Sequence, residues 1–75
     1  MESKTMALSH IIISEGFKSH LPATKKLARA YTYYKNNNTL DRSIVVDNNN
    51  TLTDGYCAYL ICKLFDVEAV EVLAA

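Results

Sequence analysis

Glycine, proline and tryptophan are scarce in this sequence of 75 residues, which has two glycines, one proline and no tryptophan. With so few chain breakers and 49% hydrophobic residues, the composition excludes a low-complexity or disordered chain. Because glycine carries an entropic cost, we expect Gly16 and Gly55 where the backbone requires them. The length allows a single domain over residues 1–75, with a core from about residue 8 to 73 that is small for an unstapled fold.

Long apolar runs are also missing. No segment approaches the run of about 18 apolar residues that a membrane helix needs. The first nine residues include Glu2 and Lys4 and lack the apolar stretch of a signal peptide. We therefore expect a cytoplasmic protein that does not enter the membrane.

Cysteine and histidine occur only twice each. Cys57 and Cys62 fall in one predicted helix, where their α-carbons would be about 8–9 Å apart and beyond disulfide reach. Reduced thiols fit the cytoplasm. His10 and His20 add no recognisable zinc spacing, so we expect no metal and no cofactor.

Neither sign of charge is in excess, because eight Lys and Arg residues balance eight Asp and Glu residues. The charges are nevertheless separated: residues 18–42 carry six positive charges against one negative, and residues 43–75 carry five negative against one positive. Two interpretations remain open, a solvated helix face or a charge asymmetry that steers partners or self-association.

Short β-branched segments alternate with two helical segments, which predicts an α+β domain in the order β-α-β-β-α-β. Strands are expected at residues 8–14, 43–46, 51–53 and 67–73. The asparagine-rich turn between the second and third strands predicts a hairpin. The last two strands flank a helix, so a right-handed crossover that makes them parallel is expected.

The first helix is predicted to start at Pro22 and to end at the asparagines after residue 35. Phe17, ahead of it, is expected to pack into the core. Apolar residues follow the i, i+3, i+4, i+7 spacing of one buried face. These residues are Leu27, Ala30, Tyr31 and Tyr34. Lys25, Lys26, Arg29 and Tyr33 occupy other directions.

The second helix is predicted to open at the Asp54-Gly55 turn, with the Asp54 carboxylate as its cap. Its buried face is expected to contain Cys57, Leu60, Ile61 and Leu64, broadened by Tyr56, Tyr59 and Phe65.

Residues 42–72 combine a strand, an asparagine turn, a short strand that ends in a glycine turn, a helix and a valine-rich strand. The segments are Ile44-Val45-Val46-Asp47, Leu52-Thr53-Asp54-Gly55-Tyr56 and Val67 to Val72. This pattern resembles the ParB/sulfiredoxin-like domain (ParB N-terminal-like), and the likeness extends over residues 8–73. Pro22 and Lys25 are similar to a proline-to-lysine segment that precedes the pattern in that family.

The resemblance implies a phosphate site at the glycine turn, with an arginine close behind the glycine. Ala58 stands where that arginine is expected, and alanine cannot supply its bidentate charged contact. In the sulfiredoxin branch a catalytic cysteine directly follows the glycine, whereas this chain has Tyr56 there and Cys57 one place later. We therefore expect no enzyme activity.

The Asp54-Gly55 turn and the adjacent Tyr56 have two interpretations, a capped structural turn or a site for a ligand or partner. Cys57 is interpreted as a small buried hydrophobe, with a nucleophile as the alternative. On the basic helix, Lys25, Arg29 and Tyr33 are further candidates for partner contacts.

The function we expect is that of a small non-catalytic regulator or inhibitor that binds another protein, which is compatible with a phage or mobile-element origin. One alternative is a residual nucleotide-binding or nucleotide-hydrolysing enzyme, in which Lys25 or Arg29 replaces the missing arginine. Another is nucleic-acid binding through the basic helix over residues 22–36, which is less favoured because Tyr31 and Tyr34 are assigned to the core. Homo-oligomerisation is also open, because it stabilises small domains.

Overall fold

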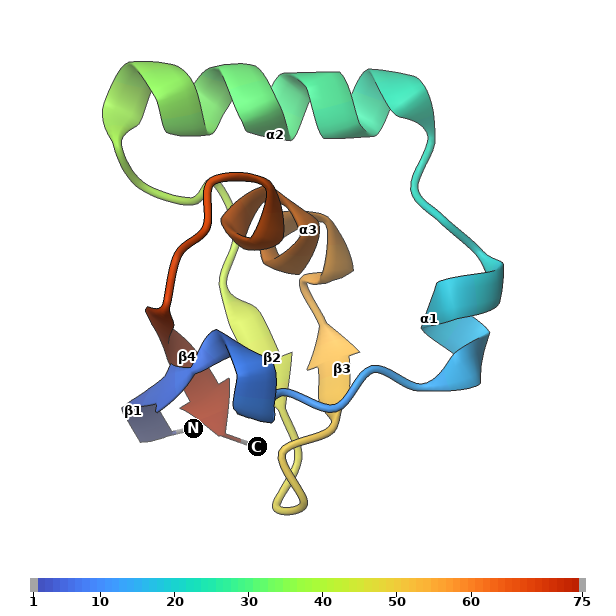
Figure 1. Ribbon diagram of the computed structural model, residues 1–75, viewed down its shortest axis with the longest axis vertical. Helices are drawn as coiled ribbons and strands as arrows, with labels where there is room; N and C mark the ends of the chain where they lie inside the picture. Colours follow the sequence, from blue (N-terminus) through green and yellow to red (C-terminus); the bar gives the residue numbers. More distant parts are fainter. Residues whose placement is uncertain (1, 75) are drawn as a thin grey trace.

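A mixed four-stranded sheet in the order β1-β4-β2-β3 forms the base of the molecule, and helix α3 lies between this sheet and helix α2 (Figure 1). The computed structural model describes residues 2–74. Its elements are β1 (Glu2–Ala7), the 3-10 turn η1 (Leu8–His10), α1 (Glu15–Ser19), α2 (Thr24–Asn37), β2 (Ile44–Val46), β3 (Leu52–Asp54), α3 (Tyr56–Leu64) and β4 (Ala69–Ala74). This architecture confirms the predicted α+β class.

Strand β4 lies between β1 and β2 in the sheet. It pairs antiparallel with β1, from Glu2 opposite Ala74 to Ala7 opposite Ala69, and parallel with β2. The hairpin of β2 and β3 forms as predicted. The predicted parallel arrangement of the last two strands is wrong: β4 runs parallel to β2, and β3 opposes both because it is antiparallel to β2. The crossover therefore consists of β3 and α3 together.

The strand predicted at residues 8–14 is wrong. The first strand is β1, and the predicted segment contains a 3-10 turn and a single parallel bridge between Ile12 and Thr51. Leu8 and Ile11 of this segment are buried in the core although their backbone is not a strand, whereas Ile12 is 54% exposed. β1 is polar and exposed, so its pairing with β4 leaves little hydrophobic pattern to detect.

Short helix α1 follows this segment, and the sequence pattern does not predict it. Phe17 of α1 packs against the core as expected. Helix α2 starts two residues after Pro22 and ends at Asn37, with Asn38 in the left-handed region at φ 59°. Asparagine tolerates this conformation, so the predicted helix end is confirmed.

The buried face of α2 is narrower than predicted. Ala30 is buried and Leu27 and Tyr34 are half-buried, but Tyr31 is 36% exposed. Its ring packs instead against Phe65, with ring centroids 5.3 Å apart. Tyr31 therefore lies at the edge of the core.

The predicted face of α3 is partly wrong. The buried residues are Ala58, Tyr59, Ile61 and Cys62, whereas Leu64 is 62% exposed. Because α3 has the sheet on one side and α2 on another, its buried surface extends around most of the helix. A single-face pattern cannot describe such a helix. The sheet supplies the most deeply buried large side chains, Ile44, Val46, Leu52 and Val72.

None of the helices within residues 2–74 combines the length and apolar character that spanning a bilayer requires.

Candidate functional site

Gly55 forms the junction between β3 and α3 in a left-handed conformation, with φ 85°. A Cβ atom at this position would overlap the backbone carbonyl oxygen of Ser43 and would lie 2.9 Å from the Cα of Ile44. The turn therefore presses directly on the start of β2. Both the backbone conformation and this close approach require glycine, as the sequence predicts.

Asp54 does not cap α3, which corrects the predicted role of its carboxylate. Its Oδ1 accepts the N–H of Gly55 at 2.8 Å and lies 4.0 Å from Nη1 of Arg42. No side chain within residues 2–74 caps the first turn of α3. The Asp54 carboxylate nevertheless lies at the positive end of the helix dipole, because it accepts the N–H of the N-cap residue Gly55.

A recess of about 200 Å³ opens beside this turn, and we call it the Gly55 recess. Three basic side chains from separate parts of the chain reach it: His20 after α1, Lys26 on α2 and Arg42 before β2. The remaining lining residues are Phe17, Pro22, Asp54, Gly55, Tyr56 and Cys57. Two permanent cations beside a helix N-terminus favour a small anion here, while the Asp54 carboxylate, which also lines the recess and pairs with Arg42, opposes it.

Lys25 and Arg29 are not among the residues that line the Gly55 recess, so this arrangement gives no support to their replacement of the missing arginine. With Tyr33, which is 42% exposed, they line an open hollow along the outer side of α2. The helix turns each residue by about 100° from the previous one, which sends Lys26 toward the recess and Lys25 away from it. The six predicted site residues thus separate into two groups of three.

Ala58 is 1% exposed and belongs to the core cluster, so this position faces the interior and not the recess. The sequence reasoning missed Lys26 and Arg42 as site residues. The strand and helix patterns assign each of them to an exposed position, and only the tertiary structure brings them beside Gly55.

Cys57 lies at the edge of the recess and donates its thiol to the carbonyl oxygen of Lys26 at 3.8 Å. Burial raises the pKa of the Cys57 thiol, and Asp41 raises it further, while Lys26 and Arg42 act in the opposite direction. A protonated thiol is a poor nucleophile, so the environment disfavours the catalytic interpretation.

We expect both thiols to react slowly at neutral pH in the folded protein. Burial raises the pKa of Cys62 as well, and its 1% exposure should make it react at least about tenfold more slowly than the half-buried Cys57. A time course with a chromogenic disulfide, read by mass spectrometry, measures this order. A Cys57→Ser variant should leave only the slow phase, and equal rates would contradict the described burial.

The raised thiol pKa values also set the sign of a pH effect on stability. The neutral thiols stabilise the fold fully below their ordinary pKa, and this contribution is lost as the pH rises above about 9.

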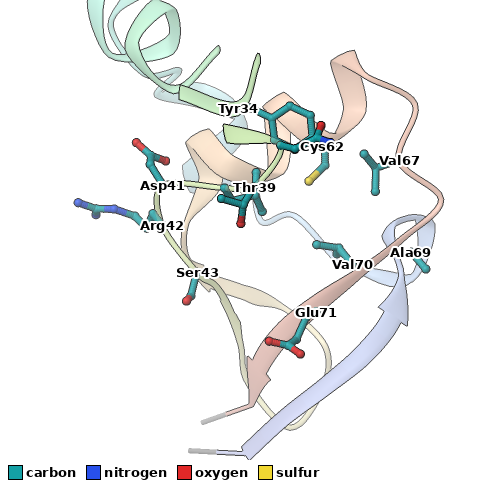
Figure 2. A pocket seen from close by; sticks show the side chains of 12 residues that line it. Tyr34, Thr39, Asp41, Arg42, Ser43, Cys62, Val67, Ala69, Val70 and Glu71 are labelled. Atoms are coloured by element: carbon teal, nitrogen blue, oxygen red, sulfur yellow. The ribbon is translucent and has the colours of Figure 1, made fainter. Parts of the chain in front are cut away.

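A second hollow of about 400 Å³ lies between the loop after α2 and strand β4 (Figure 2). Tyr34, Val67 and Val70 line it, whereas Figure 2 shows Asp41 and Arg42 extending away from it at the rim. Its charged groups do not converge on a common point. Within residues 2–74 no group of three or more His, Cys, Asp or Glu side chains is placed to hold a metal ion.

A strongly apolar depression lies between helices α2 and α3, and we call it the α2–α3 groove. Its volume is about 570 Å³ and its lining residues are Leu21, Thr24, Leu27, Ala28, Tyr31, Leu60, Ile61 and Leu64. Of these eight side chains, only Thr24 and Tyr31 contain a polar atom. Leu21 is 67% exposed and Leu64 is 62% exposed, so large aliphatic side chains are in contact with water.

The sequence reasoning missed this groove because it assigned Leu27, Tyr31, Leu60 and Leu64 to the core. The large number of apolar residues on the two helices is a sequence feature that could have indicated this groove.

No family model matches the sequence, and no curated protein matches it either. Solved structures that are similar in fold include the following two. One is the C2221 crystal form of a Pnob8-like ParB-N domain, with a TM-score of 0.82, 18% identity and a match that covers 97% of this chain and 29% of that one. The other is a pNOB8-like ParB N-domain, with a TM-score of 0.79, 16% identity, and coverage of 97% and 26%.

The chain therefore spans less than a third of either similar chain. At these identities the likeness concerns the fold. The chain has a ParB N-domain-like fold, as the resemblance in residues 42–72 predicts.

Proposed function

We propose that this chain is a small non-catalytic regulator or inhibitor that acts by binding another protein. The observation that carries the proposal is the α2–α3 groove, where exposed Leu21 and Leu64 flank an almost wholly apolar surface. Contiguous apolar surface of this kind is typical of protein interaction sites. Transfer of such side chains out of water supplies most of the favourable free energy of association.

The absence of catalysis is supported by the residues beside Gly55. Ala58 is part of the core and has no reactive group, and the raised pKa of the Cys57 thiol disfavours the reactive thiolate form. The small size and the abundance of asparagine and tyrosine fit a phage or mobile-element origin.

Affinity capture from a lysate of the organism that encodes the chain tests this function. The bait is the whole chain, and the eluate is examined by mass spectrometry for protein and by absorbance for nucleotide and nucleic acid. We expect one protein to be enriched in stoichiometric amount. Enrichment of nucleotide or nucleic acid without protein would contradict the proposal.

A second candidate function is nucleotide or anion binding in the Gly55 recess, which is favoured by the position of Lys26 and Arg42 beside the N-terminus of α3. If it is correct, a nucleoside triphosphate at about 100 times its Kd should stabilise the fold by about 2.7 kcal/mol. The melting temperature measured with millimolar triphosphate would then rise by roughly 10–20 °C.

Lys26→Ala and Arg42→Ala should each remove this shift, while Lys25→Ala, on the outer side of α2, should retain it. If wild-type protein shows no shift at millimolar concentration, the second candidate is rejected.

A further inference from the structure

The two helices that line the α2–α3 groove carry charge of one sign. Helix α2 contains four basic residues and α3 contains one, and neither helix contains an aspartate or a glutamate. The basic residues are Lys25, Lys26, Arg29, Lys35 and Lys63. An apolar surface embedded in a purely basic pair of helices differs from a general hydrophobic patch, because it selects partners by charge.

Three of these cations border the groove along α2. Lys35 lies over the ring of Tyr31, with Nζ 5.8 Å from the ring centroid, at one end of the groove. Lys25 and Arg29 line the outer hollow, which shares Ala28 with the groove. The apolar floor and the basic rim are therefore neighbouring surfaces of one helix.

The dimensions of the groove fit a helix. From Thr24 to Tyr31 the lining extends along about 10 Å of α2, which corresponds to two helical turns. A partner helix with apolar residues at i, i+3, i+4 and i+7 places one continuous stripe over such a length. Carboxylates beside that stripe would then face the basic rim.

We propose that the α2–α3 groove binds an acidic amphipathic helix of a partner protein, with the apolar stripe against Leu64 and the carboxylates opposite Arg29 and Lys35. The inference rests on the proposed function and specifies its surface and the chemistry of its partner. Salt should weaken the charged contacts at the rim and leave the apolar contact largely unchanged.

A second copy of the chain fits this surface less well. A twofold symmetric dimer through the groove would bring α2 of each copy, with its four cations, against the other. Nucleic acid fits less well too, because the Tyr31 ring stacks on Phe65 at 5.3 Å and carries Lys35 on its surface. That ring is not free to stack on a base.

Two fluorescent model peptides of equal length test the inference. Both place leucines at i, i+3, i+4 and i+7, and they differ only in having glutamate or lysine at the remaining positions. By fluorescence anisotropy we expect the glutamate peptide to bind at least about tenfold more tightly than the lysine peptide.

Variants of the whole chain then locate the site. Leu64→Ser should lower the affinity for the glutamate peptide about tenfold, because it removes an apolar contact at an exposed position where a serine is tolerated. The double variant Arg29→Glu/Lys35→Glu should also weaken it about tenfold. The matched control is Lys4→Glu on β1, on the far side of α3 from α2, and it should change the affinity less than about twofold. Circular dichroism confirms that each variant is folded.

Equal affinity for the two peptides would overturn the inference. Unchanged affinity of the Leu64→Ser variant for the glutamate peptide would overturn it too. So would sedimentation that shows a wild-type dimer and a Leu64→Ser monomer, because the occupant would then be a second copy. Affinity capture from the lysate, repeated with the Leu64→Ser variant as bait, distinguishes failure of the groove inference from failure of the proposed function. Capture of a protein that is unaffected by Leu64→Ser rejects the groove, whereas capture of no protein rejects protein binding itself.

Discussion

Gly55→Ala is expected to leave most of the protein unfolded at room temperature. The left-handed conformation at φ 85° costs an alanine about 1–2 kcal/mol. The added methyl group also meets the backbone of Ser43 and Ile44, which cannot move aside without displacing β2. Together these effects should reduce the free energy of unfolding by roughly 3–5 kcal/mol, which approaches the whole stability of a domain this small.

Gly16→Ala is the matched control for this prediction. A Cβ at Gly16 would make only an ordinary contact of 3.8 Å with Oγ of Ser14. Because Gly16 lies within helix α1, alanine should leave the stability unchanged or raise it by up to about 1 kcal/mol. Urea denaturation followed by circular dichroism measures both variants. A loss below about 1 kcal/mol for Gly55→Ala would show that the turn is not under the described constraint.

Leu52→Ala should have the second largest effect. Leu52 is 2% exposed at the centre of the core, so its truncation removes buried methyl groups and leaves a cavity. Such substitutions cost about 2–5 kcal/mol. The expected consequence is a marked fall in the urea midpoint with little change in the slope of the transition.

Leu64→Ala provides the comparison, since Leu64 is the same residue type at 62% exposure. It should cost less than about 1 kcal/mol. The pair therefore distinguishes leucines that hold the fold together from leucines that remain available at the α2–α3 groove. A cost for Leu64→Ala equal to that for Leu52→Ala would mean that the groove is closed in solution.

The sequence was most informative where structure is local. The hairpin of β2 and β3 and the asparagine end of α2 depend on neighbouring residues, and both are confirmed. The requirement for glycine at position 55 was also predicted from its scarcity and its place in the strand-to-helix turn. The contact with Ser43 that makes the requirement strict was not, because it joins two separate segments.

Features created by tertiary packing could not be predicted in this way. β1 is mostly polar and is held in the sheet by backbone pairing with β4, so its sequence has little apolar alternation from which a strand could be predicted. The exposure of Leu64 depends on how α2 crosses α3, which neither helix encodes alone. For the same reason Lys26 and Arg42 appear as surface charges in the sequence and as neighbours of Gly55 in the structure.

The position of β4 between β1 and β2 has a consequence for how the chain folds. Until Ala69–Ala74 has been synthesised, β1 and the hairpin have no common neighbour in the sheet. Residues from opposite ends of the chain must then meet, and closing so long a loop slows folding compared with a helical protein of equal size. Until β4 pairs with β2, the edge of the hairpin that β4 covers remains exposed to other contacts.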